Sequence, residues 1–300
     1  MARDYRFVQV DVFTDQVFGG NPLAVVLDGR GLDDGEMQAI AKEMNLSETT
    51  FLLPPSRADC AARVRIFTPG RELPFAGHPT LGTAWVMAVE HLLPDGASTL
   101  VLEQRIGPVP VEFEGDPRRP RFVWMGHRDA TFGSELKDRA AVAAALGLSD
   151  RDLAPGVPIE PGSTGNAFVY VPLRDRDAVD RIEIDVKALG ACLTDGAHGA
   201  FVLAADPDPS RRRLYGRMFA PGLGLREDPA TGSASGALGA YAVRHRLVTA
   251  NDETRIVSEQ GTKMGRQSFV HITLRADGDR ITDIRVGGSV VPVLDGHLTL

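Results

Sequence analysis

The chain has 300 residues, of which 43% are hydrophobic and 24% are charged, and its formal net charge is −7 at pH 7. This composition is typical of a globular protein with one large domain or two smaller ones, and we favour two domains. An acidic chain lacks the basic field that attracts nucleic acids and anionic membranes, so we expect neither as a partner.

The sequence also predicts where the protein is found and which cofactors it lacks. No apolar run approaches the roughly 18 residues of a membrane helix, and the first residues lack the apolar core of a signal peptide. We therefore expect a cytoplasmic protein. Cys60 and Cys192 stand apart from each other and from histidine clusters, which predicts no metal site, no disulfide framework and two buried small side chains.

Apolar periodicity predicts strands interrupted by single helices. The expected strands are Arg6–Phe13, Leu23–Leu27, Thr50–Leu53, Arg63–Phe67, Thr99–Leu102, Val109–Phe113, Arg121–Met125, Ala167–Val171, Gly199–Ala204, Leu214–Phe219, Arg255–Glu259, Phe269–Leu274 and Arg280–Val286. The expected helices are Asp34–Met44, Thr80–His91, Ser134–Leu146, Val186–Cys192 and Ser233–His245. This order favours an α+β fold with mixed or antiparallel sheets packed on a helix.

The two parts of the chain contain similar segments. Gly20–Val26 resembles Gly165–Val171, and each segment precedes a glycine-rich helix start by a similar distance. We expect an N-terminal half at 1–126 and a C-terminal half at 127–286, with the boundary near Gly126–Arg128. The sequence leaves open whether the last strand, 287–300, joins the first half.

The first helix start is Phe75–Gly82. Pro79 suits the first helical position, which places His78 at or beside the cap. Histidine is a poor capping residue, so its presence there suggests another role, although packing with one satisfied nitrogen is an equal alternative.

The second helix start is Glu227–Gly236. Thr231 or Ser233 can cap this helix. Burying the charge of Asp228 in a packed interface costs free energy unless the carboxylate is paired, and His78 is a possible partner. Gly236 and Gly239 give the helix a small-residue face that Gly82 of the first helix could match. Two converging helix starts would make an anion site.

Glu48 is the third candidate. It follows the first helix and precedes an apolar strand, where partial desolvation would raise its pKa toward that of a general acid/base. Most glutamates in such a place are surface residues, so the position of Glu48 alone does not distinguish a general acid/base from a surface side chain.

Five ordered motifs resemble the PhzF-like phenazine-biosynthesis isomerase family, within the superfamily of diaminopimelate epimerase and proline racemase folds. They are Val10–Thr14 with Gly20–Pro22, Asn45–Thr49, Phe67–Thr80, Glu227–Ser233, and Glu259–Gly261 with Met264–Arg266. The resemblance implies two pseudo-symmetric diaminopimelate epimerase-like halves, each a mixed or antiparallel sheet curled around a central helix. It also implies an active site in the cleft between them, a homodimer, and no metal or organic cofactor.

The same resemblance suggests roles for individual residues. Glu48 matches the proton carrier, His78 and Asp228 match an assisting pair, and substrate-contacting positions fall on Gly77, Gly232 and Ser233. The racemases of the superfamily use two cysteines, whose places Ala76 and Thr231 occupy here. Neither side chain can exchange a proton as a thiol does, which disfavours two-thiol racemisation.

We therefore expect a cofactor-independent isomerase. A small carboxylate-bearing substrate, similar to trans-2,3-dihydro-3-hydroxyanthranilate, would bind at the helix starts while Glu48 moves a proton between two of its carbons. Two alternatives stay open: an epimerase of a small amino or hydroxy acid with a second base, and a small-molecule-binding protein without catalysis.

Overall fold

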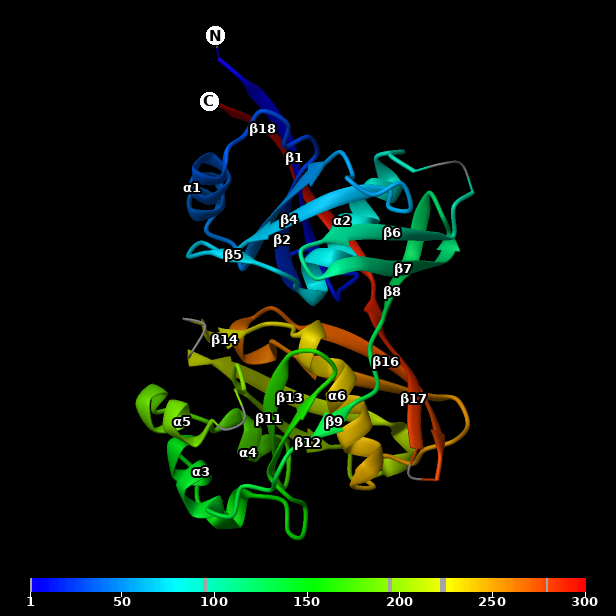
Figure 1. Ribbon diagram of the computed structural model, residues 1–300. Coiled ribbons are helices and arrows are strands. Elements are labelled where there is room, and N and C mark those ends of the chain that lie inside the picture. Colours follow the sequence, from blue (N-terminus) through cyan, green and yellow to red (C-terminus); the bar gives the residue numbers. More distant parts are fainter. Residues whose placement is uncertain (1, 94–95, 194–195, 222–224, 279) are drawn as a thin grey trace. The chain divides into compact units, whose positions relative to one another are not determined.

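The computed structural model describes residues 2–93, 96–193, 196–221, 225–278 and 280–300. The chain divides into two compact units. Unit 1 is Met1–Gly126 with Gly287–Leu300, and unit 2 is His127–Val286. In each unit a sheet curls around one helix (Figure 1).

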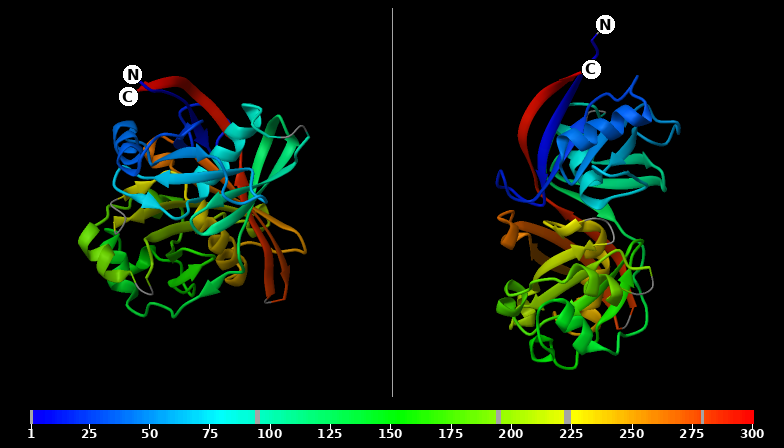
Figure 2. Two further views of the ribbon diagram at one scale, coloured as in Figure 1. Left: turned by 45° about the horizontal axis from the view of Figure 1, so that its top comes forward. Right: turned by 90° about the vertical axis from the view of Figure 1, so that its left-hand side faces the viewer.

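Unit 1 contains nine strands and two helices among its described residues. The strands are β1 (Asp4–Val12), β2 (Asn21–Val26), β3 (Glu48–Leu53), β4 (Ala62–Phe67), β5 (Glu72–Leu73), β6 (Thr99–Gln104), β7 (Gly107–Asp116), β8 (Arg119–Gly126) and β18 (Val290–Thr299). The helices are α1 (Asp34–Met44) and α2 (Gly77–Val89). β18 is antiparallel to β1, so the last strand and both termini belong to unit 1 (Figure 2).

The sheet of unit 1 mixes strand directions. β2 is parallel to β3 and β4 is parallel to β6, while the other pairs within this unit are antiparallel. Helix α2 is buried along its length from Gly77 to Ala88, as expected of a helix enclosed by its own sheet. Helix α1 begins at an Asp33 capping box and packs its Met37 and Ile40 against a core that includes Phe51.

Unit 2 repeats this topology. Its elements are β9 (Thr131–Phe132), α3 (Arg139–Ala145), β10 (Glu160–Ser163), β11 (Ala167–Pro172), α4 (Arg176–Asp180), α5 (Val186–Cys192), β12 (Ala200–Ala205), β13 (Arg213–Ala220), β14 (Leu225–Asp228), α6 (Gly232–Arg244), β15 (Thr254–Gln260), β16 (Ser268–Asp277) and β17 (Arg280–Gly288), of which β17 ends two residues into unit 1. β11 is parallel to β12 and β13 is parallel to β15, with antiparallel pairs between them, as in unit 1. Helix α6 takes the place of α2.

The hairpin before each central helix is held in the same way. In unit 1 the Arg65 guanidinium binds Glu72 at 2.8 and 2.9 Å, and in unit 2 Arg217 binds Glu227 at 2.9 and 2.8 Å. Each guanidinium lies 5.0 Å from the ring of the phenylalanine two residues further on. Each glutamate precedes the first residue of its helix by five positions, so these ion pairs fix the entry of the chain into α2 and α6.

Several local predictions need correction. The helix expected at Ser134–Leu146 spans only Arg139–Ala145, because Asp138 caps it there. The glycines expected to form matching helix faces contact their own units: a methyl group on Gly82 would lie 2.6 Å from Leu23, and one on Gly239 would lie 2.6 Å from Ile272. Small residues are needed because each helix passes close to strands of its own sheet. Within the described part of the chain, no helix has the length and apolarity to span a bilayer.

Candidate active site

The turn between β1 and β2 places a carbonyl group at the site. Gly20 has φ of +59°, and a methyl group added there would lie 2.3 Å from the Val12 carbonyl oxygen, so this position requires glycine. The turn delivers Asn21 and Pro22 to the start of β2. Because proline has no N–H, Pro22 contributes only an acceptor there.

Glu48 is the first residue of β3. Helix α1 ends at Asn45, whose left-handed conformation (φ 51°) turns the chain back toward the sheet. β3 then runs parallel to β2 with Glu48 opposite Leu23, next to Pro22 in sequence. Glu48 is only 8% exposed, so the predicted partial burial of this carboxyl is confirmed.

His78 lies in the first turn of α2. The helix begins at Gly77 with Ala76 at the N-cap, and Ala76 makes no side-chain hydrogen bond. Pro79 is therefore the third helical residue and not, as predicted from the sequence, the first. Its missing N–H is equally harmless there, because the first four N–H groups of a helix have no partner within the helix. The His78 side chain is buried.

Glu48 and His78 meet within unit 1. The Oε2 atom of Glu48 lies 3.2 Å from Nε2 of His78, with both side chains largely buried. Burial lowers the pKa of His78 to about 3, and a hydrogen bond to the Pro22 carbonyl acts in the opposite direction. At pH 7 the imidazole is therefore neutral and has one N–H.

The hydrogen bonds of His78 indicate its tautomer. Nε2 makes no regular hydrogen bond to a described residue, so the bond to Pro22 comes from Nδ1. A neutral ring with its hydrogen on Nδ1 has a lone pair on Nε2, which faces the Glu48 carboxyl.

Asp228 lies in unit 2, at the turn that leads into α6. Its carboxylate accepts a 2.5 Å hydrogen bond from the Thr231 hydroxyl. Gln260 at the end of β15 holds the same turn: its amide donates to the Asp228 carbonyl (2.7 Å) and accepts from the Thr231 backbone N–H (3.1 Å). Thr231 is the N-cap residue of α6, one of the two predicted positions, but its hydroxyl binds Asp228 and makes no cap hydrogen bond.

The starts of the two central helices differ from those of the other α-helices. α1, α3, α4 and α5 each begin with an aspartate whose side chain accepts a backbone N–H. Neither α2 nor α6 has a side-chain cap. The N–H groups at Gly77 and Gly232–Ser233 are therefore not taken up by an N-cap side chain, as an anion-binding helix start requires.

The candidate residues divide between the units. Unit 1 contains Gly77 and the Glu48–His78 contact, and unit 2 contains Asp228 with Gly232 and Ser233. The pairing of His78 with Asp228 and the shared cleft stay predictions.

Two further residues did not emerge from sequence reasoning. Pro22 and Gln260 lie in two of the motifs that carry the family resemblance, Gly20–Pro22 and Glu259–Gly261. Membership of these motifs is the one feature of the sequence that could have pointed to them. Their roles depend on a carbonyl and an amide that reach the site only in the folded chain. Of the two cysteines, Cys60 is buried as expected, whereas Cys192 is only half-buried. No group of three or more potential metal-ligating side chains occurs among the residues described.

Comparison with known proteins identifies the family of the chain. The phenazine biosynthesis-like protein family (PhzC-PhzF) matches residues 10–296. The trans-2,3-dihydro-3-hydroxyanthranilate isomerase of Pseudomonas aeruginosa is 36% identical, over 99% of this chain and 100% of its own length. A PhzF-family phenazine biosynthesis protein from Bacillus anthracis superposes with a TM-score of 0.89 at 29% identity, covering 99% of both chains.

A more distant structure shows how widely the fold occurs. A hydroxyproline epimerase from Agrobacterium vitis has a TM-score of 0.69 at 12% identity, covering 99% of this chain and 93% of its own. The repeated sheet-around-helix units therefore define the diaminopimelate epimerase-like and proline racemase-like class of fold, as predicted. Within that class the chain belongs to the PhzF family and is an isomerase.

Proposed function

We propose that the protein is a cofactor-independent isomerase that uses Glu48 to move a proton between two carbons of a small conjugated carboxylate. The carboxylate of Glu48 takes a proton from one carbon, and the same carboxyl group returns it to another carbon. The observation that carries this proposal is the buried contact of 3.2 Å between Glu48 and a histidine that is neutral at pH 7.

His78 assists Glu48 in this proposal. Its Nε2 lone pair accepts a hydrogen bond from the Glu48 carboxyl while the carboxyl carries the substrate's proton, and the Pro22 carbonyl fixes the ring orientation. Because His78 is neutral, it orients the proton carrier and does not itself supply a proton as a cation.

The substrate's anion binds at helix starts. The uncapped N–H groups of α2 at Gly77 and of α6 at Gly232–Ser233 suit a carboxylate, and Asp228 acts on the same substrate as a polar partner. The name of the Pseudomonas aeruginosa relative supplies the substrate to test first, trans-2,3-dihydro-3-hydroxyanthranilate.

The second unit supports a mechanism with one base. In unit 1, Ala24 of β2 pairs with Thr49 of β3, and the corresponding pair in unit 2 is Val169 of β11 with Ala200 of β12. Glu48 directly precedes Thr49, so its counterpart in unit 2 is Gly199, which directly precedes Ala200. A methyl group at Gly199 would lie 2.3 Å from the Phe219 carbonyl oxygen, which excludes a carboxylate side chain there.

Incubation with trans-2,3-dihydro-3-hydroxyanthranilate in D₂O, followed by NMR, tests this function. The proposal predicts an isomerised product with deuterium at the carbon that receives the proton. Deuterium at an inverted centre of otherwise unchanged substrate would indicate an epimerase, and binding without exchange would indicate a non-catalytic protein. Either result would overturn the proposed function.

Two other expectations belong to the same proposal. The resemblance to PhzF-like isomerases predicts a homodimer, which sedimentation equilibrium tests by a mass of twice 32.2 kDa. A cytoplasmic location is the other expectation, and cell fractionation checks it.

A further inference from the structure

His127 is a partly buried histidine of unit 2 that has no part in the chemistry described above. It follows β8, and its backbone N–H donates to the Ile284 carbonyl at 2.8 Å. Its imidazole lies against Gly236 of α6: a methyl group at Gly236 would lie 2.6 Å from the His127 Nδ1 atom. Gly236 therefore provides the space that the ring occupies.

One nitrogen of this ring has a partner and the other does not. Nδ1 lies 2.8 Å from the Thr164 hydroxyl oxygen, whereas Nε2 is buried without a hydrogen bond to any described residue. Burial lowers the pKa of His127 to about 4, so the ring is neutral at pH 7. A buried polar nitrogen without a partner is destabilising, so its occurrence calls for an explanation such as a bound molecule.

The ring lies near the start of α6. Residues three and four apart on a helix are neighbours, with Cβ atoms about 5–6 Å apart, so a ring on Gly236 is within one turn of Gly232 and Ser233. The start of α6 has no side-chain cap, and its partial positive charge favours an anion over a protonated histidine. If the Thr164 hydroxyl donates to Nδ1, the neutral ring carries its hydrogen on Nε2.

We propose that His127 is a substrate-binding residue whose Nε2–H donates a hydrogen bond to an oxygen of the carboxylate held at the start of α6. The inference rests on the proposed function, because it assigns a donor to the carboxylate of that substrate. Three observations converge on it: the space left by Gly236, the contact with Thr164, and the unpartnered buried Nε2.

Substitution of His127 tests the inference through affinity. In His127→Leu we expect KM for trans-2,3-dihydro-3-hydroxyanthranilate to rise about 10- to 100-fold, the range for losing a hydrogen bond to a charged group, with little change in kcat. The Kd for 3-hydroxyanthranilate, a stable aromatic analogue, should rise equally. His127→Gln, which retains a donor, should recover most of the affinity.

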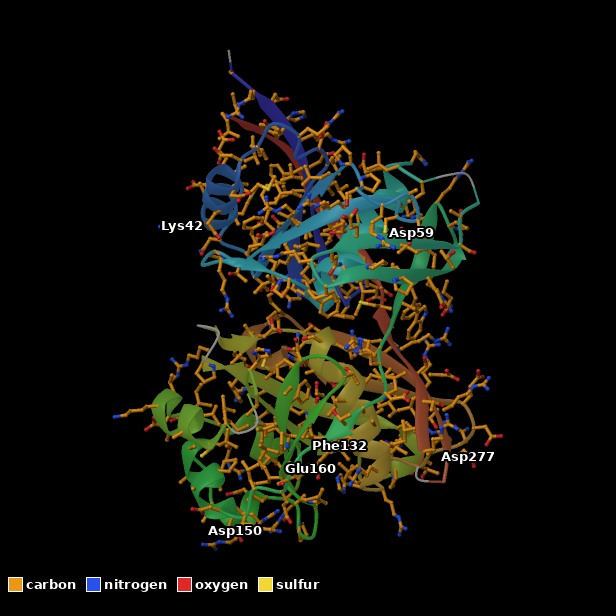
Figure 3. The ribbon with its side chains drawn as sticks, viewed as in Figure 1. Lys42, Asp59, Phe132, Asp150, Glu160 and Asp277 are labelled. Carbon is orange, nitrogen blue, oxygen red and sulfur yellow. The ribbon has the colours of Figure 1, made fainter. Side chains whose placement is uncertain are left out.

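His245 provides a matched control. It is a largely buried histidine at the other end of α6, and its Nε2 lies 2.7 Å from Glu160 of β10, which is labelled in Figure 3. His245→Leu should lower the melting temperature without changing KM or the analogue's Kd. A comparable rise in KM in this variant would show that the effect of His127 is only structural and would overturn the inference.

A second readout does not depend on a variant that folds. In ¹⁵N-labelled wild-type protein, saturation with 3-hydroxyanthranilate should shift the Nε2 resonance of His127 and leave that of His245 unchanged. If wild type turns over the substrate while His127→Leu keeps its KM and Kd and the resonance does not move, the inference is wrong and the proposed function stands. If wild type neither turns over the substrate nor binds the analogue, the proposed function fails and the inference fails with it.

Discussion

The Nε2 atom of His78 lies 3.2 Å from Oε2 of Glu48, although the two residues are 30 positions apart in the chain. The contact depends on three local structures: the turn at Gly20 that presents the Pro22 carbonyl, the left-handed Asn45 that ends α1, and the uncapped first turn of α2. Each is encoded by a short segment, and the parallel pairing of β2 with β3 brings them together.

Replacing His78 should impair catalysis more than binding. In His78→Asn the Glu48 carboxyl loses the acceptor at Nε2, and we expect kcat to fall about 100-fold, within the range for general acid–base assistance. KM should change by less than about threefold, because His78 is proposed to contact the proton carrier and not the substrate's anion. Steady-state kinetics measures both quantities.

His245 again supplies the control, because it also forms a largely buried histidine–glutamate contact, with Glu160 in unit 2. His245→Asn should leave kcat unchanged. An equal loss of kcat in both variants would mean that the His78 effect reflects general damage to a packed core.

Protein stability should fall in mild acid. Burial lowers the pKa of His127 to about 4, below the value of about 6.5 for histidine in an unfolded chain. Between these pH values the unfolded state binds more protons, so the free energy of unfolding decreases as pH falls through 6.5 toward 4. At pH 5 the ring alone accounts for a loss of about 2 kcal/mol relative to pH 7.

Urea unfolding at pH 7 and pH 5 measures this loss. Wild type should lose about 2 kcal/mol more than His127→Gln between the two pH values. His78 has its pKa lowered in the same direction and is present in both proteins, so its contribution cancels. Equal losses in the two proteins would contradict the lowered pKa of His127.

Gln260 should matter for activity as well as for stability. Gln260→Leu removes the amide that binds Asp228 and Thr231, leaves buried polar groups unsatisfied and should cost about 3 kcal/mol of unfolding free energy. Because the turn carries Asp228, we expect kcat/KM to fall about 10- to 100-fold through misplacement.

The control for Gln260 is Gln104, which ends β6 of unit 1 and donates to Thr80 at 2.7 Å. Gln104→Leu should reduce stability while kcat/KM changes by less than about threefold, because Gln104 holds neither Glu48 nor His78. If Gln260→Leu kept full kcat/KM despite reduced stability, the turn at Asp228 would have no functional role.

The sequence predicted local structure well wherever periodicity was strong. Helix α1 has the predicted bounds Asp34–Met44, and α2 and α6 begin within three residues of their predicted starts. Short elements such as β5 and α4 were missed, because two to five residues show no period. The sequence does not predict the pairing of β18 with β1, since strand pairing between distant segments depends on contacts that no local pattern encodes.

The candidate site was only partly predictable. Glu48 and His78 were singled out separately, by a strand beside a helix end and by a poor cap, but nothing local linked them. His127 was missed because its environment, Gly236 and Thr164, comes from segments 37 or more positions away. The sequence predicts that the glycines of α6 face a second helix, whereas in the structure Gly236 makes room for the ring of His127.

The most direct test of the proposed function is the turnover of trans-2,3-dihydro-3-hydroxyanthranilate by Glu48→Gln. The amide has nearly the same shape as the carboxyl group but cannot carry the proton, so kcat should fall by about 10²- to 10⁴-fold while 3-hydroxyanthranilate still binds. Full turnover by Glu48→Gln would show that another group moves the proton and would contradict the mechanism proposed for Glu48.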